Sequence, residues 1–244
     1  MKNSVGIIGG VGPMATVYFM NLIIDMTEAS KDQDHINMLV ANHATIPDRT
    51  DYILGKGEDS PADYMIEDGL MLQNAGCEFL VIPCNTAHFF YKEITAAVGL
   101  PVLNIVEETV KLAKKRGADA GSDIKTIGIM ATEGTISTGT YRTYGEPFGV
   151  DIVVPDREYQ EKVNSIIYDK VKAGLPVSSD EMMLVIDHLR SKGAQAVIMG
   201  CTELSIAYRD LDIGKLNEDV VDSLEALAGA TVLRCGKEIR QEKK

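Results

Sequence analysis

The sequence predicts an α/β protein with two pseudo-symmetric domains, each a mostly parallel sheet flanked by helices. Two observations support this fold class. Short apolar runs alternate with amphipathic helical stretches along most of the 244 residues, as in strand–helix–strand units, and the chain contains an internal repeat. The apolar runs predict seven strands, at residues 4–9, 36–43, 79–84, 102–105, 126–130, 150–155 and 196–201.

Two stretches between these strands have apolar residues at helical spacing, residues 62–76 and 179–193. Ser178 to Glu181 (SSDE) opens the second of them with residues typical of a helix N-terminus, and Gly193 closes it. Both stretches therefore predict helices that cover the sheets.

The internal repeat aligns AGCEFLVIPCNT (residues 75–86) with KGAQAVIMGCTE (residues 192–203) without a gap, so that Cys84 matches Cys201. A second echo, in the same order, pairs VGIIGGVG (residues 5–12) with IGIMATEG (residues 127–134). We therefore expect two similar halves, each ending a central strand with a cysteine and starting a helix just after it. The predicted first domain contains residues 1–103 and 208–244, and the second contains residues 104–207.

The composition narrows the class of protein. With 24 Lys and Arg against 36 Asp and Glu, the net charge is −12, which disfavours binding to nucleic acid or to an anionic membrane. No apolar run approaches the ~20 residues of a membrane-spanning helix, and the N-terminus lacks the features of a secretory signal. We expect a cytoplasmic protein, in which the four cysteines form no disulfides and their spacing forms no zinc site.

Cys84 and Cys201 each lie at the predicted carboxyl end of a strand, followed by polar residues and a new helix. Ligands of parallel α/β sheets bind at this edge, and a helix N-terminus favours a thiolate. Two thiols on opposite sides of one carbon suit inversion of that carbon, because one removes a proton and the other returns one. The alternative is that both are buried core cysteines, which is the role we assign to Cys77 and Cys235.

Gly10, Gly12 and Ala15 fit the start of a dinucleotide-binding fingerprint, G-x-G-x-x-A. The acid that this fingerprint requires at the end of the next strand is replaced by Asn42 and His43. We interpret the glycines as a tight turn that lines the active-site cleft and offers N–H groups to a carboxylate. A non-enzymatic protein that binds a nucleotide or another small molecule is the alternative.

Over nearly its whole length the chain resembles the aspartate/glutamate racemase superfamily, and most closely its aspartate racemases. The resemblance rests on GGVGPMAT (residues 9–16), IPDRTDYILGKGED (46–59), PCNTAH (83–88), ATEGT (131–135), IYDKVKAG (167–174) and GCTELS (200–205). It implies two pseudo-symmetric α/β domains with the active site in the cleft between them, no pyridoxal phosphate or other cofactor, no metal, and a homodimer.

The resemblance also implies the site residues. Cys84 and Cys201 would be the catalytic acid/base pair, and Arg49 and Lys172 would bind the side-chain carboxylate of the substrate. The remaining substrate-binding residues would be Gly12, Asn85, Thr86, Thr132, Thr135, Tyr168 and Thr202. Two roles stay open: His88 assists Cys84 or serves capping and packing, and Glu203 tunes Cys201 or anchors other site residues.

The implied activity is cofactor-independent racemisation of aspartate by a thiol/thiolate pair. Glutamate is a possible second substrate, because one methylene changes binding by only ~1–3 kcal/mol. Glutamate racemases usually begin with DSGxGG and carry histidine after the second Cys-Thr, whereas this chain has GIIGGVGP and Glu203, which favours the aspartate branch. The alternative within the fold is a racemase or isomerase of another small acid, of the glutamate, hydantoin or maleate type.

Overall fold

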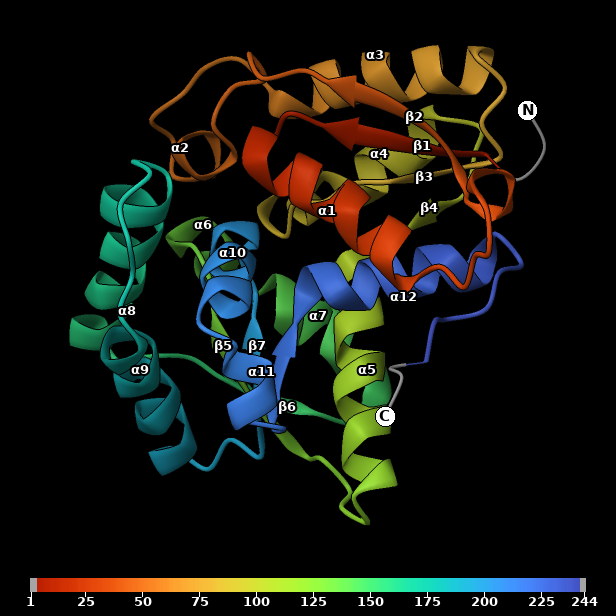
Figure 1. The fold of residues 1–244 in the computed structure, drawn as a ribbon. Coiled ribbons are helices and arrows are strands. Elements are labelled where there is room, and N and C mark those ends of the chain that lie inside the picture. The colour runs from red at the N-terminus through yellow and green to blue at the C-terminus, as the bar shows by residue number, and fades with distance from the viewer. Residues whose placement is uncertain (1–3, 242–244) are drawn as a thin grey trace. The chain divides into compact units, whose positions relative to one another are not determined.

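The seven predicted strands are present in the computed structural model, which describes residues 4–241, and an eighth joins them. They form two separate four-stranded parallel sheets (Figure 1). Each sheet belongs to one of two compact units. The first unit is formed by the chain up to Ile105 and from Leu224 onward, and the second runs from Val106 to Ser223. The predicted α/β fold with two flanked parallel sheets is confirmed.

The first unit has the strand order β2-β1-β3-β4, with all neighbours parallel. In Figure 1, α3 lies on one face of this sheet and α1 on the other. Its elements are β1 (Ser4–Gly9), α1 (Pro13–Met26), η1 (Asp32–Asp34), β2 (Asn37–Asn42), α2 (Arg49–Ile53), α3 (Pro61–Asn74), β3 (Phe79–Val81), η2 (Thr86–Phe90), α4 (Tyr91–Ala97), β4 (Val102–Leu103) and, after the second unit, α12 (Ser223–Arg234).

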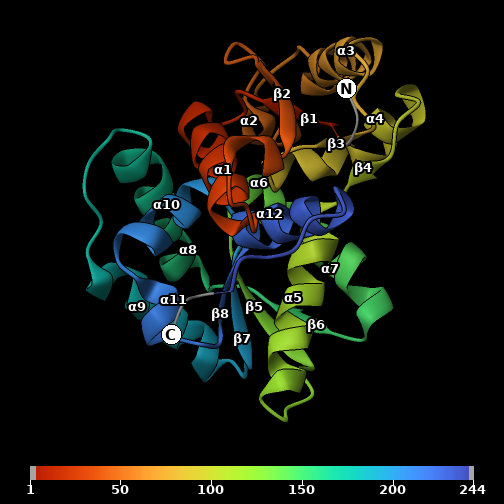
Figure 2. The same ribbon diagram turned by 45° about the vertical axis from the view of Figure 1, so that its right-hand side comes forward.

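The second unit has the strand order β6-β5-β7-β8, which can be followed across Figure 2, and it is also fully parallel. Its elements are α5 (Ile105–Asp119), β5 (Thr126–Met130), α6 (Glu133–Ser137), α7 (Thr140–Gly145), η3 (Glu146–Phe148), β6 (Asp151–Val153), α8 (Arg157–Asn164), η4 (Ser165–Val171), α9 (Ser179–Ser191), β7 (Ala196–Met199), α10 (Thr202–Asp210), α11 (Ile213–Leu216) and β8 (Val220–Asp222).

The two repeated segments form neighbouring strands in each unit, β1 and β3 in the first and β5 and β7 in the second. In the first unit Val5 pairs with Phe79, and in the second Ile127 pairs with Ala196. These are equivalent positions in both alignments, so the two units share strand order, direction and register. The repeat read from the sequence is therefore a structural repeat.

The packing of a helix onto the central strand is repeated as well. A Cβ added at Gly6 would lie 2.6 Å from Leu80 Cδ2 and 3.1 Å from Leu72 Cβ, on α3. At the equivalent Gly128 a Cβ would lie 2.9 Å from Leu189 Cβ, on α9. Glycine on the central strand lets the helix approach closely, and the repeat sets Leu72 and Leu189 at matching positions.

One boundary between the units differs from the prediction. The crossing predicted after residue 103 lies at Ile105, but the return predicted after residue 207 lies at Ser223. Residues 208–223 stay in the second unit because they contain β8, whose Val220 pairs with Val197 of β7. This buried strand is only 3 residues long and gives no alternating pattern to detect in the sequence.

The predicted helix ends are largely confirmed. Ser178 caps α9 through a capping box, in which its Oγ accepts a hydrogen bond from the Glu181 N–H at 3.3 Å and Glu181 Oε2 accepts one from the Ser178 N–H at 3.0 Å. Pro13 stands at the first position of α1, where its missing N–H costs nothing. Within residues 4–241, no helix has both the length and the apolar character needed to cross a membrane.

Candidate active site

In the first unit, the predicted site residues follow three neighbouring parallel strands. Gly12 lies in the turn after β1, Arg49 begins α2 after β2, and Cys84 follows β3. Because β2, β1 and β3 are adjacent and parallel, these residues come from one edge of the sheet, its carboxyl edge. Asn85 and Thr86 continue directly from Cys84.

Cys84 is buried, with 6% of its surface exposed. It lies in a short turn, in which the Cys84 N–H donates to the carbonyl of Ile82 at 2.8 Å. A helix follows, as predicted, but it begins as the 3-10 helix η2 at Thr86 and becomes the α-helix α4 only at Tyr91. The buried Asn85 stands at the N-cap of η2. The thiol thus lies at the start of a tighter and shorter helix than its counterpart in the second unit.

His88 holds the backbone of this turn rather than its sulfur. Its Nδ1 lies 2.8 Å from the Cys84 carbonyl oxygen, and the Ile105 N–H donates to its Nε2 at 3.2 Å. Because that N–H is only a donor, Nε2 is the acceptor and Nδ1 carries the proton. Burial lowers the pKa of His88 from 6.5 to about 4, so the ring is neutral at neutral pH. This geometry fits a packing role for His88 rather than assistance to the Cys84 sulfur.

Arg49 is positioned by a capped turn. Asp48 caps α2 by accepting the Thr50 N–H at 2.8 Å, and Arg49 Nη1 donates to the carbonyls of Pro47 at 3.0 Å and Ile46 at 3.3 Å. Its Nε is buried and has no hydrogen-bond partner among the residues that the structure describes. A buried, unsatisfied guanidinium N–H is costly unless an anion meets it, which fits a carboxylate ligand.

The glycine turn after β1 is tight for a local reason. Gly10 has φ +80°, and a Cβ there would lie 2.3 Å from the backbone of His43, while Gly12 has φ 108°. Thr16 Oγ1 closes the turn by accepting the Gly10 N–H at 3.0 Å. His43 stands at the end of the next strand, where a dinucleotide fingerprint has a ribose-binding acid. Its Nδ1 lies 3.1 Å from Asp68 Oδ2.

In the second unit, Thr132 and Thr135 follow β5. Thr132 caps α6 by accepting the Thr135 N–H at 3.3 Å, and the two hydroxyl oxygens lie 3.1 Å apart. Gln160 on α8 supports this turn by donating from Nε2 to the Ala131 carbonyl at 2.9 Å. Gln160 Oε1 is buried without a partner in the described part of the chain. Sequence reasoning missed Gln160, because an isolated glutamine on a helix carries no signal.

Tyr168 and Lys172 lie on a π-helix and at its end. The segment η4 spans Ser165–Val171, and the Lys172 N–H donates to the carbonyl of Ile167, five residues back, at 3.0 Å. π-helices are rare and are often found at functional sites. The Lys172 ammonium lies 4.5 Å from the centre of the Tyr168 ring, within cation–π range, and 3.9 Å from Glu203 Oε1.

Cys201 stands at the N-cap of the 9-residue α-helix α10, and 5% of its surface is exposed. Its Sγ donates to Glu203 Oε2 at 3.0 Å, and the Thr202 hydroxyl lies 3.5 Å from the same oxygen. Glu203 therefore connects the Cys201 thiol with Lys172, one carboxylate oxygen facing each. The sequence indicated Glu203 as a possible neighbour of Cys201 but not this link.

The other two cysteines behave as core residues, as expected. Cys77 occupies the position equivalent to Ala194, and burial raises the pKa of its thiol. Burial likewise raises the pKa of Cys235, to about 11. Within residues 4–241, no three His, Cys, Asp or Glu side chains gather in an arrangement that could hold a metal ion.

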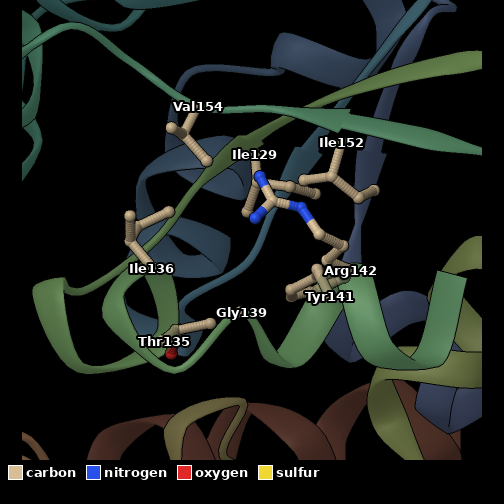
Figure 3. Close-up of a pocket in the computed structure, with 8 residues that line it drawn as sticks. All are labelled: Ile129, Thr135, Ile136, Gly139, Tyr141, Arg142, Ile152 and Val154. Atoms are coloured by element: carbon tan, nitrogen blue, oxygen red, sulfur yellow. The ribbon is translucent and has the colours of Figure 1, made fainter.

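A small hollow in the second unit lies beside this group of residues but is too small for an amino acid. It measures about 20 Å³, enough for a single water molecule, and Ile129, Ile152 and Val154 form its apolar walls. Figure 3 shows the Arg142 guanidinium over these walls, while the Thr135 oxygen points away from them. Thr135 is a predicted site residue that lines this hollow, but its hydroxyl is turned away from it.

Comparisons with known proteins identify the family of the chain. The family model described as Asp/Glu/Hydantoin racemase matches residues 8–231. The broad specificity amino-acid racemase RacX of Bacillus subtilis is 29% identical over 232 residues, which cover 93% of this chain and 96% of that protein.

Solved structures of racemases share the fold of this chain. The aspartate racemase of Picrophilus torridus superimposes with a TM-score of 0.79 at 31% identity and covers 99% of this chain and 97% of its own. A glutamate racemase from Francisella tularensis, in complex with D-glutamate, shares the fold with a TM-score of 0.62 at 18% identity, over 99% of this chain and 84% of its own. The family match spans most of both units, so this chain belongs to the Asp/Glu/hydantoin racemase family.

Proposed function

We propose that the protein racemises aspartate, and glutamate to a lesser extent, through a two-base mechanism in which Cys84 and Cys201 act on the same α-carbon. The main support is that the two cysteines are equivalent. Cys84 follows β3 and Cys201 follows β7, at the same position of the structural repeat. Each unit also supplies one cation, Arg49 in the first and Lys172 in the second.

The reaction consists of two proton transfers. A thiolate on one side of the substrate removes the α-proton and leaves a carbanion, which is delocalised into the α-carboxylate of the substrate. The thiol on the other side then donates a proton to the opposite face of the α-carbon. The two thiols exchange roles when the other enantiomer is the substrate. Because the thiols supply both transfers, the proposed reaction requires no added cofactor.

Each part of the substrate has a candidate partner. Polar groups at Asn85, Thr86, Thr132, Thr135 and Thr202, with the N–H groups of the Gly12 turn, would bind the α-carboxylate and the amino group. A dicarboxylate leaving water loses hydration worth several kcal/mol per ion unless it is paired. Arg49, with its unsatisfied Nε, and Lys172 would provide that pairing, in a protein whose net charge is −12.

The relatives support an acidic substrate without fixing it. The Picrophilus structure at 31% identity is an aspartate racemase, whereas the Bacillus relative at 29% identity is a broad specificity racemase. The second name favours a wider range of amino acids as the second candidate function. We also keep the homodimer and the cytoplasmic location as predictions, and light scattering of the purified protein tests the first of these.

The direct test measures D-aspartate formed from L-aspartate by chiral chromatography, after dialysis against a chelator and without added cofactor. We expect conversion towards an equal mixture, and slower conversion of glutamate. A panel with neutral amino acids, a hydantoin and maleate distinguishes the broader function. Absence of turnover with both aspartate and glutamate would contradict the proposal.

Single cysteine variants test the mechanism. Cys84→Ala and Cys201→Ala should each lower racemisation by at least a thousandfold, because inversion needs both thiols. In D2O the remaining thiol can still exchange the α-proton of one enantiomer. Cys77→Ala is the matched control, since the equivalent position in the second unit is Ala194, and it should keep turnover within about threefold. Equal losses in all three variants would indicate a structural role for the cysteines.

A further inference from the structure

We propose that the two thiols begin the reaction in different protonation states, with Cys201 kept as the thiol by Glu203 and Cys84 serving as the resting thiolate. Glu203 is in this view a positioning residue that acts through Cys201. The inference rests on the proposed function for the role of Cys84. If Cys201 is protonated, a two-base racemase needs Cys84 as the base that removes the α-proton.

The contact between Cys201 and Glu203 determines where the proton lies. An ionised carboxylate only accepts hydrogen bonds, so the Sγ that lies 3.0 Å from Glu203 Oε2 must carry the proton. A thiolate in the same place would set two negative charges side by side in a largely buried environment, which strongly disfavours the charged sulfur.

The other groups around Cys201 do not reverse this preference. The N-terminus of α10 favours a thiolate, but it carries only about half a unit charge, against the full charge of the carboxylate. Lys172 lies 3.9 Å from the far oxygen of Glu203 and forms an ion pair with it. Tyr141 on α7 is neutral, because burial raises its pKa.

The first unit has no carboxylate at the corresponding position. The repeat aligns Cys84-Asn85-Thr86 with Cys201-Thr202-Glu203, so a neutral hydroxyl replaces the acid. His88 on η2 is neutral and donates to the Cys84 carbonyl. Three helices pack against η2. α3 carries Asp68, which is already paired with His43. α2 carries the cation Arg49 and the exposed Asp51, and α4 carries the exposed Lys92 and Glu93. The two thiols are about equally exposed, at 6% and 5%, so accessibility does not make them different.

The proton transfers balance from this starting state. Cys84 sulfur forms an S–H bond as the C–H bond of the substrate breaks, and the electron pair stays on the α-carbon. The Cys201 S–H bond then breaks as its proton reaches the opposite face. This leaves Cys84 as a thiol and Cys201 as a thiolate beside Glu203. Proton exchange with solvent then removes the proton from Cys84 and returns one to Cys201, which restores the starting state.

The test measures the alkylation rate of each cysteine by iodoacetamide between pH 6 and 10, with peptide mass spectrometry. The pH at which each rate is half of its plateau reports the thiolate, and dividing by the plateau removes differences in access. In the wild type we expect this midpoint to be at least one pH unit lower for Cys84 than for Cys201, which is a tenfold difference in thiolate at a given pH below both.

Two substitutions identify the cause. Glu203→Gln keeps the size of the side chain and removes its charge, and it should lower the Cys201 midpoint by at least one unit without moving that of Cys84. Thr86→Glu places the acid in the first unit and should raise the Cys84 midpoint. Glu161→Gln, an exposed glutamate on α8, is the control and should change neither.

Two results would overturn the inference: a Cys201 midpoint at or below that of Cys84, or a Cys201 midpoint that does not respond to Glu203→Gln in a variant with native circular dichroism. Alkylation needs no turnover, so its outcome is separate from that of the proposed function. If racemisation fails while the midpoints differ as expected, the proposed reaction is wrong and the assignment of the protons stands.

Discussion

Gly200 leaves no room for a side chain immediately before Cys201. A Cβ there would lie 3.1 Å from both Ile129 Cγ2 and Tyr141 Cε2, and 3.2 Å from the Met130 carbonyl oxygen. We expect Gly200→Ala to lower the free energy of unfolding by about 1–3 kcal/mol through overpacking, and to reduce kcat by displacing Cys201. Urea unfolding and steady-state kinetics measure the two effects. The control is Gly57→Ala, where the nearest atom is 3.7 Å away and little change is expected. A neutral result at Gly200 would mean that the strand end can shift freely.

His88 makes the stability of the protein depend on pH. Its pKa falls from 6.5 to about 4 on folding, so the unfolded chain binds more protons than the native one in this range. The native state should therefore lose up to about 3 kcal/mol of stability from this group as the pH falls from 6.5 to 4, with no loss above 6.5. His88→Asn cannot titrate, so its stability should fall less steeply between pH 7 and 4.5. Urea titrations of both proteins at several pH values measure the slopes, and parallel slopes would contradict this account.

At the scale of residues, the sequence revealed positions but not contacts. The places of Cys84 and Cys201 after equivalent strands could be predicted, because the repeat aligns them and apolar runs show where the strands end. The hydrogen bond from Cys201 to Glu203 and the neutral ring of His88 depend on rotamers and burial, which the spacing of residues in the sequence does not determine. Gln160 was missed for the same reason, since its orphaned oxygen exists only in the folded turn.

At the scale of elements, the start of α9 could be predicted from the sequence, because Ser178 and Glu181 form a capping box. Ser178 and Glu181 satisfy each other's backbone N–H groups, so Ser178→Ala removes an acceptor from the first turn. We expect a loss of about 1 kcal/mol in the free energy of unfolding, with unchanged racemase kinetics, because α9 carries none of the proposed site residues. Ser191→Ala, in the last turn of the same helix, is the matched control. A loss of activity in Ser178→Ala at full stability would be unexpected.

Other elements could not be predicted. β8 has only 3 residues and is recognisable only through its pairing with β7. The π-helix that carries Tyr168 has the same residue types as an ordinary α-helix. In an α-helix each residue turns by about 100°, so Gln160 and Lys172, twelve positions apart, would face different directions. The wider π turns rotate less per residue and bring Lys172 back towards the Gln160 face.

At the scale of the whole molecule, the second unit is one continuous stretch with its own sheet and its own buried core around Met130, Ile167 and Leu204. We expect a fragment of residues 105–223 to fold cooperatively, with helical circular dichroism and a single unfolding transition, but without racemase activity because it lacks Cys84. A fragment ending at residue 207 lacks β8 and should not fold. If both fragments behave alike, β8 contributes less to the core than its pairing indicates.

The first unit, in contrast, is completed by the far end of the chain. The Glu28 N–H donates to the Glu238 carbonyl at 2.9 Å, the Arg240 N–H donates to the Met26 carbonyl at 2.8 Å, and Thr27 and Ile239 form a β-bridge. During synthesis on the ribosome, these partners emerge only after the whole second unit has been made. Most of the first unit is therefore translated before the second unit but is finished after it, and nascent chains stalled after about residue 223 should be the form most dependent on chaperones.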